Sequence, residues 1–429
     1  MASSFKTLAF GFLLIFTGFL QTSAADVTID VNDISFLFQV PKTGADAEAL
    51  IALDSEHDSG EPIMPKEMFA DVMTAAKAIE HKASSSTVFK INIPNSTPES
   101  SFEHPHNWKV AGIRVHPSSL GTSPEHVAMF GSPRTVRLIV QPVTVKNDVA
   151  KVHDYGAHVV FAFPDEEGFR SLLRDLVALK RLVETKTPTN VPLSIHPGIT
   201  ANVEGFKEDL RALVMKHLSR ERLQIVSFMG IRPPEPWIFF AMSKINGRLV
   251  IKDLGKDLSV KYDDGADLLN GQMLILIGGK PVTPTLKADS RNGTGMSTAP
   301  LFEQDDLAGK LFPDATDPKL ALLKFADIPD VIANPNMHHN RNTDCVSCHT
   351  ETALRRRLGL QPSQFAFKRP EGVSGVDEGM LPENDWNVHN FGWFPDFSGH
   401  AVETVTQRTA NEAAASADFI NKTFPEELK

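Results

Sequence analysis

The first part of the chain alternates short apolar runs with polar, proline-containing stretches. Residues 34–40 (Ile-Ser-Phe-Leu-Phe-Gln-Val) alternate in a way that predicts a strand, and residues 65–79 have helical spacing after a proline. Residues 84–105 are rich in Ser, Pro and Asn and predict a loop. Residues 26–135 are therefore expected to form a region of mixed strands and loops.

A more regular pattern begins at Val136. Residues 136–140 and 158–163 are apolar runs that predict strands. Residues 165–183 predict a helix, because Phe169 and the leucines that follow it recur on one face. Acidic residues stand at the start of this segment and basic residues near its end, as the helix dipole prefers. The segment is the clearest helix in the chain.

A shorter version of the same unit follows. Residues 204–207 (Glu-Gly-Phe-Lys) are similar to residues 167–170 (Glu-Gly-Phe-Arg) and open a second amphipathic helix that runs to about Leu218. Two strands are predicted between residues 223 and 242. Strand–helix units of this kind pack on a sheet, so residues 136–310 are predicted to form an α/β region.

Turn signals dominate the next stretch of sequence. Four turn dipeptides lie among short apolar runs and predict hairpins: Asn246-Gly247, Asp264-Gly265, Asn270-Gly271 and Gly278-Gly279. Residues 311–429 predict short helices, a coil rich in Gly, Pro and Asn, and a last helix over 402–423. The predicted fold class is α+β or mixed, in which the N-terminal α/β region precedes a small, mainly helical and irregular C-terminal domain.

Composition limits the classes of function. The chain has 429 residues, and its 41% hydrophobic content allows a sizeable buried core. The formal net charge of -10 argues against nucleic-acid binding, which requires a basic surface. After the N-terminal segment, no stretch is long and apolar enough to span a bilayer. The chain is therefore expected to have no integral membrane span and no nucleic-acid partner.

Residues 1–25 have the pattern of a secretory signal peptide. Lys6 gives the positive start, residues 8–20 the apolar core, and Ser23 and Ala25 the small residues before the cleavage point. The mature chain would then be exported, to the bacterial periplasm or to the cell surface. Because the chain has only two cysteines, and these belong to the motif described next, its fold must be stable without disulfides.

The strongest chemical signal is the sequence Cys345-Val346-Ser347-Cys348-His349. Two thiols three residues apart, followed directly by a histidine, form the C-x-x-C-H pattern of covalent haem attachment. With two cysteines placed at random, this arrangement should arise in about one chain in ten thousand. The motif therefore predicts one covalently attached haem c.

On these five residues the last quarter of the chain resembles c-type cytochromes. The resemblance implies that Cys345 and Cys348 form thioether bonds to the haem and that His349 is the proximal iron ligand. It also implies a cytochrome c-like haem domain at residues 311–429, preceded by some 300 residues of unknown role.

The second axial ligand remains open between several candidates. His389 stands among aromatic residues able to cover a haem face, and Met380 lies in an irregular segment two residues before a proline. His338 or His339, just before the motif, is a further candidate, and an open iron site is the remaining alternative. His400 is expected to be a surface histidine.

Other residues near the motif have a structural and a functional interpretation. Five aromatic residues form the densest aromatic cluster of the chain, and they would wall a haem pocket or fill a core: Trp386, Phe391, Trp393, Phe394 and Phe397. The Arg355–Arg357 run could pair with a haem propionate, although a solvated helix face is the simpler interpretation. The histidines around His104 and His106 are expected to be surface residues rather than a copper site.

These observations favour an exported monohaem c-type cytochrome-like protein that transfers electrons to a redox partner protein, in an oligomeric state that the sequence leaves open. One alternative is a haem enzyme of peroxidase type, with an open iron and His338 or His339 as acid or base. Another is a module that holds zinc through the two cysteines, His349 and one of these histidines. The sequence makes an electron carrier the first hypothesis.

Overall fold

The computed structural model describes part of the chain. The described residues are 27–57, 59–78, 80–82, 88–91, 93, 101–120, 127–128, 131–231, 237–251, 260–261, 267–268, 272–274, 276–277, 280–281, 333–336, 349, 351–352, 375–383, 387, 389–395 and 400–429. The signal-peptide segment, both cysteines of the motif and the boundary expected near residue 311 lie outside these ranges.

The described elements are as follows. The helices are α1 (Val31–Ile34), α2 (Gly44–Glu48), α3 (Lys66–Ala78), α5 (Glu166–Glu184), α6 (Pro197–Thr200), α7 (Phe206–His217) and α12 (Gln407–Thr423), with 3₁₀ turns η2 (Pro105–Asn107), η6 (Glu378–Met380) and η7 (Pro425–Leu428). The strands are β1 (Ser35–Leu37), β2 (Glu80–Lys82), β3 (Val88–Lys90), β4 (Trp108–His116), β5 (Thr135–Lys146), β6 (Val149–Val152), β7 (Gly156–Ala162), β8 (Leu223–Ile231), β9 (Trp237–Ile245), β10 (Arg248–Ile251), β11 (Val260–Lys261), β12 (Asp267–Leu268), β13 (Gln272–Leu274), β14 (Leu276–Ile277), β15 (Lys280–Pro281), β16 (Phe391–Pro395) and β17 (Ala401–Val405).

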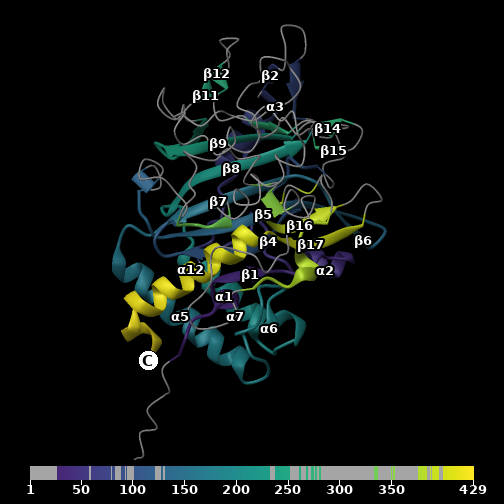
Figure 1. Ribbon diagram of the computed structural model, residues 1–429. Coiled ribbons are helices and arrows are strands. Elements are labelled where there is room, and N and C mark those ends of the chain that lie inside the picture. The colour runs from purple at the N-terminus through teal and green to yellow at the C-terminus, as the bar shows by residue number, and fades with distance from the viewer. Residues whose placement is uncertain are drawn as a thin grey trace, which may run out of the picture.

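One large antiparallel sheet organises the fold (Figure 1). Its strand order is β1-β4-β5-β7-β8-β9-β10, with β6 also paired to β5 and β13 to β9. Every named pair in it is antiparallel. The mixed α and β content is confirmed, but the strand–helix units are joined differently from a parallel α/β fold. The helices α5 and α7 lie between β7 and β8 in the chain. This connection returns to the end of the sheet at which β7 finishes, so β8 pairs with β7 in the antiparallel direction.

Most of the predicted elements are confirmed with small shifts. The helix predicted at 165–183 is α5, whose first turn is capped by the Asp165 side chain accepting from the Gly168 N–H. The Asn246-Gly247 dipeptide joins β9 to β10 with positive φ at both residues, as a two-residue hairpin turn requires. The strand predicted at 34–40 is shorter, because residues 31–34 form the helical turn α1.

Three predictions need correction. Val88–Lys90 in the predicted loop is a strand that pairs with β2. The last helix begins at Gln407 rather than 402, because the preceding residues form β17 and Thr406 caps the helix by accepting from the Thr409 N–H. The second amphipathic helix predicted from residue 204 is confirmed as α7, but it begins differently from α5: Gly168 lies inside α5, whereas Gly205 precedes α7 with φ 78°.

One face of the sheet is apolar. Trp108 of β4 contacts Phe228 of β8, and Phe228 stacks on Phe240 of β9 with a centroid distance of 5.1 Å. Phe69 of α3 meets the Trp108 ring edge-on from the helical layer. Successive side chains of a strand point to opposite faces of the sheet. The residues that alternate with these aromatic residues therefore point to the opposite face.

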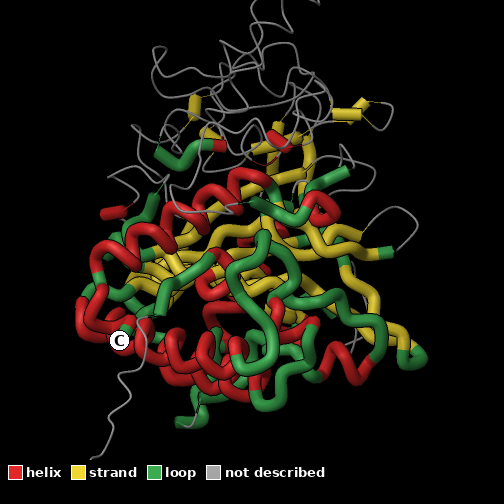
Figure 2. The backbone as a smooth tube through the Cα atoms, turned by 60° about the horizontal axis from the view of Figure 1, so that its bottom comes forward, coloured by secondary structure: helices red, strands yellow, loops and turns green. Residues whose placement is uncertain are grey.

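The C-terminal segment covers that opposite face. In both views α12 runs across the strands, and the β16–β17 hairpin lies beside it (Figures 1 and 2). The Gln141 side chain of β5 donates to the Trp393 carbonyl and accepts from the Trp393 N–H, both at 2.7 Å. The Trp393 indole N–H donates to the Phe38 carbonyl at 2.8 Å. The buried residues of the hairpin and of α12 belong to the same hydrophobic core as the sheet.

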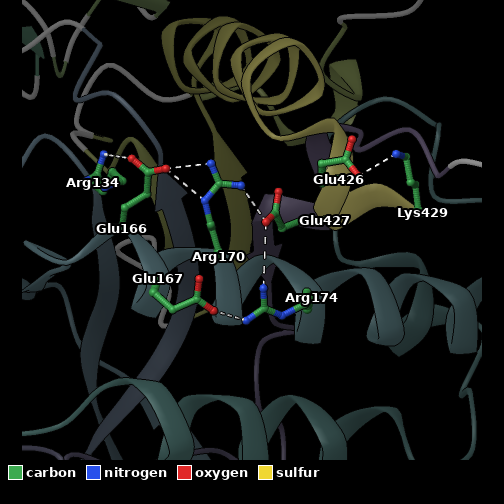
Figure 3. A network of polar contacts seen from close by, with 8 residues as sticks. All are labelled: Arg134, Glu166, Glu167, Arg170, Arg174, Glu426, Glu427 and Lys429. Carbon is green, nitrogen blue, oxygen red and sulfur yellow. Dashed lines mark hydrogen bonds and ion pairs between the residues drawn. The ribbon is translucent and has the colours of Figure 1, made fainter.

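The described C-terminal part contains the β16–β17 hairpin and the long helix α12, besides the 3₁₀ turns η6 and η7. A cytochrome c-like helical arrangement stays a prediction for the remainder of 311–429. The end of the chain returns to the first described residues: the Val27 N–H donates to the Leu428 carbonyl at 2.7 Å. Nearby, the buried carboxylate of Glu427 is held by Arg170 at 2.7 Å and Arg174 at 3.9 Å (Figure 3).

Candidate functional site

The face of the sheet beneath the C-terminal segment carries an unusual number of polar residues. We call it the polar face, defined by Arg114 and His116 of β4, Arg137 of β5, His158 of β7 and Ser227 of β8. The strand register places them together, because Arg114 is opposite Arg137, Arg137 is opposite Val160, and His158 is opposite Ser227. A buried sheet face normally consists of apolar residues, so this face requires a chemical reason.

The centre of the polar face retains accessible surface. Arg137, His158 and Ser227 are half-buried, as is Ala241, which is opposite Ser227 on β9. The positions two residues on either side of His158, on the same face, are Gly156 and Val160, and both are buried. The accessible surface is therefore confined to a patch floored by small and cationic residues, with His158 at its middle.

His349, the expected proximal ligand, acts electrostatically on His158. It has helical backbone and is half-buried. Burial, then the charge of Arg137 and then that of His349 lower the pKa of His158 well below its ordinary value. A charge acts in this way only at short range in the interior of a protein. His349 therefore contributes to the electrostatic environment of His158, although the two residues are 191 positions apart in the sequence.

Arg114 is bound to a carboxylate from α12. Glu412 accepts from the Arg114 guanidinium at 3.0 Å, and its other oxygen lies 3.7 Å from His116 Nδ1. Burial alone would raise the pKa of Glu412, but the guanidinium groups of Arg114 and Arg408 hold that pKa below its usual range. Burial likewise lowers the pKa of Arg408 to about 10 and the pKa of His116 well below its ordinary value. Glu412 is therefore ionised and His116 is neutral.

Two donor atoms of this cluster are buried and lack a hydrogen-bond partner among the described residues. They are Nε of Arg114 and Nε2 of His116, which can donate depending on the tautomer. A buried donor left unsatisfied costs about 1–3 kcal/mol, so native proteins rarely keep one without a bound group. The cluster therefore has the character of a site for an acidic ligand.

The charge balance of the cluster agrees with this interpretation. Three guanidinium groups, from Arg114, Arg137 and Arg408, are within electrostatic reach of Glu412. A second buried carboxylate, besides Glu412, is Glu351, which stands two residues after His349 in the motif-bearing segment. Among these described groups the cations outnumber the carboxylates by three to two. Arginine binds carboxylates through two parallel hydrogen bonds, which suits the two propionates of a haem.

Both flanks of the predicted haem motif contact α12. Before the motif, the Asn411 side chain donates to the carbonyl of Ala333 at 2.9 Å. After it, the Thr352 hydroxyl accepts from the Gln407 N–H at 3.2 Å. Residues 407–417 of α12 are buried on every side. The buried helix α12 therefore contacts both the polar face, through Glu412, and the residues on either side of the motif.

Comparison with known proteins gives no further information. No family model, no curated protein and no solved structure matches this chain. The interpretation of the site therefore depends on the residues themselves.

His389 lies on the polar face, as a haem-facing residue would, but its ring is already engaged. Its Nε2 is 2.8 Å from the Asp154 carboxylate, and the ring is buried. A Cβ on Gly156 of β7 would lie 3.7 Å from His389 Cε1, so the ring covers that glycine. His389 therefore lies over the same strand as His158, with its Nε2 atom bound to Asp154.

Met380 is placed elsewhere. It is half-buried in η6 and lines a small cavity with residues 187–200, among them Ile195 and Pro197. Ile195 pairs with Leu37 in an isolated parallel β-bridge on the outer side of β1. Four strand spacings, about 19 Å, separate that position from β7 and His158. Met380 therefore lies near the β1 side of the sheet.

The remaining predicted residues have several different outcomes. Cys345, Cys348, His338, His339, Trp386, Phe397 and Arg355–Arg357 lie outside the described residues. Trp393 is a core residue, and His400 is exposed, as expected. His106 contacts Glu48 and Asp54 in a partly exposed cluster. Within the described part of the chain, no group of three His, Cys, Asp or Glu side chains is arranged to hold a metal ion alone.

Sequence reasoning missed the polar face, although a signal was present. In the strand Gly-Ile-Arg-Val-His at 112–116, polar residues alternate with apolar ones, which predicts one charged face and one core face. That the charged face is covered could not be inferred from the strand.

No helix among the described residues is long and apolar enough to cross a membrane.

Proposed function

We propose that this chain is a c-type haem protein that transfers electrons, and that its haem, attached through Cys345 and Cys348, lies against the polar face of the sheet. The observation that supports the proposal most is the covered polar face, where Arg114 and Arg137 lie opposite each other and α12, which holds Arg114 through Glu412, also contacts both flanks of the motif. In this proposal the sheet is part of the haem site rather than a separate domain.

The residues of the polar face have distinct roles in the proposal. Arg114 and Arg137 would bind the propionates. Glu412 of α12, which covers the face, would hold the Arg114 guanidinium in position. The haem supplies one-electron chemistry by cycling between ferric and ferrous iron. The cationic face and the exclusion of water by α12 tune the energy of that change. Export to the bacterial periplasm or cell surface, with a redox partner protein there, completes the proposal.

The experiment is maturation of the full chain in a bacterium competent for covalent haem attachment. We expect haem staining on a denaturing gel, a polypeptide mass increased by one haem, and a ferrous spectrum typical of haem c. The C345S/C348S double variant is the matched control and should be colourless. A colourless wild-type protein at the bare polypeptide mass would overturn the proposal, and stoichiometric zinc in that protein would favour the zinc alternative.

A haem enzyme is the second candidate, and one observation favours it. His389 is buried and oriented by Asp154 on the face where the haem would lie. A histidine held by a carboxylate is the usual arrangement for a general acid or base. The two functions differ in a simple measurement: an enzyme with an open iron binds cyanide and peroxide, whereas a six-coordinate electron carrier binds neither rapidly.

A further inference from the structure

A small cavity lies between the loop that precedes α6 and the turn η6. Its volume is about 230 Å³, below the roughly 300–1,000 Å³ of sites for drug-sized ligands. Apolar side chains, among them Ile195, Pro197 and Met380, form part of its wall. Asp377 is the one charged side chain among the described residues that line it. The cavity therefore suits a small ligand with an apolar body and a polar end.

Two hydroxyl groups of the cavity wall have already used their protons. The Ser194 hydroxyl donates to the Ile195 carbonyl at 3.1 Å. The Thr200 hydroxyl donates to the Pro197 carbonyl, also at 3.1 Å. A hydroxyl has one proton and two lone pairs, so both oxygens can accept from a ligand but cannot also donate to it.

Asp377 adds a carboxylate that the backbone holds in position. Its Oδ1 atom accepts from the Gly379 N–H at 3.0 Å, which leaves Oδ2 to accept from a ligand. The Asp377 N–H donates to the Leu193 carbonyl at 3.0 Å, and the Leu193 N–H donates to the Gly375 carbonyl at the same distance. These bonds fix η6 to the loop, so the acceptors on the two sides of the cavity keep their spacing.

The loop is also held from the interior of the protein. The Asn32 side chain donates to the carbonyls of Thr189 and Val191 at 3.0 and 2.8 Å. The Lys180 ammonium group donates to the Thr189 hydroxyl at 2.5 Å. Both Asn32 and Lys180 are buried. A site whose walls are fixed in advance loses less conformational entropy when a ligand enters.

We propose that this cavity binds a primary ammonium group carried on a short alkyl chain. An ammonium group has three donors and no acceptor, so it matches the oxygens of Ser194, Thr200 and Asp377. Its charge is opposite to that of Asp377, and charge-assisted hydrogen bonds are about twice as strong as neutral ones. The alkyl chain would contact Ile195 and Met380. The cavity is on the β1 side of the sheet, so this inference does not depend on the proposed haem.

Other ligand classes fit the same wall less well. An anion would meet the Asp377 carboxylate and two hydroxyl groups that have no proton to donate. A calcium ion takes about six to eight oxygen ligands, often from several carboxylates, and the described wall has one carboxylate. An organic cation needs fewer oxygens and also uses the apolar part of the wall.

The test is a titration of the full-length protein with n-butylamine, which is protonated at pH 7, followed by saturation-transfer NMR. We expect saturable binding, and weaker binding of 1-butanol and butyrate, which lack the positive charge. D377N should weaken butylammonium binding by about tenfold or more, because a hydrogen bond to a charged group is lost. Asparagine keeps the oxygen that accepts from Gly379, so the turn should be preserved. D148N is the matched control, because that carboxylate accepts from the Gly44 N–H at 3.0 Å outside the cavity.

A second variant and a second probe complete the test. T200V removes one acceptor at similar volume and should weaken binding by a smaller factor than D377N. N-acetyl-lysine methylamide distinguishes two sources of the ammonium group: binding at least as tight as that of butylamine supports a lysine side chain of a peptide, and weaker binding supports a free amine. Equal affinities for butylamine and 1-butanol, equal losses in D377N and D148N, or no saturable binding would overturn the proposal.

Discussion

Arg114 and Arg137 lie directly opposite each other on neighbouring strands, with the same charge on a covered face of the sheet. Like charges in this relationship are destabilising, so the pair is tolerated only because something acidic is close to it. Glu412, from the other end of the chain, provides one carboxylate by accepting from Arg114 at 3.0 Å. The proposed haem propionates would provide the remainder.

Removing the Glu412 charge should therefore destabilise the fold. We expect E412Q to lower the free energy of unfolding by about 3–5 kcal/mol, because it leaves Arg114 buried without its carboxylate. Urea denaturation followed by circular dichroism measures this. The control is E167Q, which removes an exposed carboxylate that pairs with Arg174 and should cost less than about 1 kcal/mol. Equal losses in the two variants would contradict the importance of the buried pair.

The guanidinium of Arg137 should raise the reduction potential of the haem. A nearby positive charge disfavours the ferric state, which carries one more positive charge than the ferrous state. If the proposed haem lies on this face, we expect R137Q to lower the potential by an amount on the order of 50 mV, because a positive charge near the iron is removed. Spectroelectrochemistry measures it, and R248Q, at the exposed partner of Asp71, is the control. An unchanged potential in R137Q would separate Arg137 from the haem.

His196 should make the fold sensitive to acid. Its ring is buried between Phe36 and Phe206, with centroid distances of 4.9 and 4.5 Å, and burial first, then Lys180, lowers its pKa to about 3. In the unfolded chain the pKa returns to about 6.5, so the unfolded state binds more protons between these values. The stability from neutral His196 is present above pH 6.5 and is lost as the pH falls towards 3.

The matched measurement is the slope of unfolding free energy against pH in wild type and in H196N. We expect the wild-type slope to exceed the variant slope by up to about 1.4 kcal/mol per pH unit below pH 6. H400N removes an exposed histidine and should leave the slope unchanged. Identical slopes in wild type and H196N would show that His196 does not titrate on unfolding.

Gly112 should be required for docking of the β16–β17 hairpin. A Cβ at this position would lie 2.5 Å from a ring carbon of Phe391, so the two elements approach as closely as a glycine allows. We expect G112A to cost about 1–3 kcal/mol of unfolding free energy through overpacking. G156A should cost less, because its nearest neighbour is the flexible Met229 methyl at 3.3 Å.

A double-mutant cycle isolates the contact. In an F391A background the space beside Gly112 opens, so the further cost of G112A should fall by more than 0.5 kcal/mol, beyond the usual additivity error of about 0.5 kcal/mol. Thermal or urea unfolding of the four proteins gives the coupling free energy. Additive costs would show that the alanine strains the backbone of β4 instead of the hairpin contact.

The sequence by itself determined those local elements whose hydrophobic positions repeat regularly or whose turn residues are specific. It also determined the one chemical motif. The amphipathic spacing after Asp165 is enough to predict α5, and Asn246-Gly247 is enough to predict the β9–β10 turn, because both signals act over a few residues. The motif at 345–349 likewise needs no fold to be identified. These signals are local, and they were interpreted correctly wherever the structure tests them.

The tertiary structure decided which residues share the polar face. The alternation in β4 predicts that Arg114 and His116 share a face, but only the register of β4, β5 and β7 brings Arg137 and His158 beside them. Glu412 reaches this face because α12 lies on it, and that is a contact between residues almost 300 positions apart. Pairing of distant strands depends on burial summed over the whole core, which no local pattern in the sequence encodes.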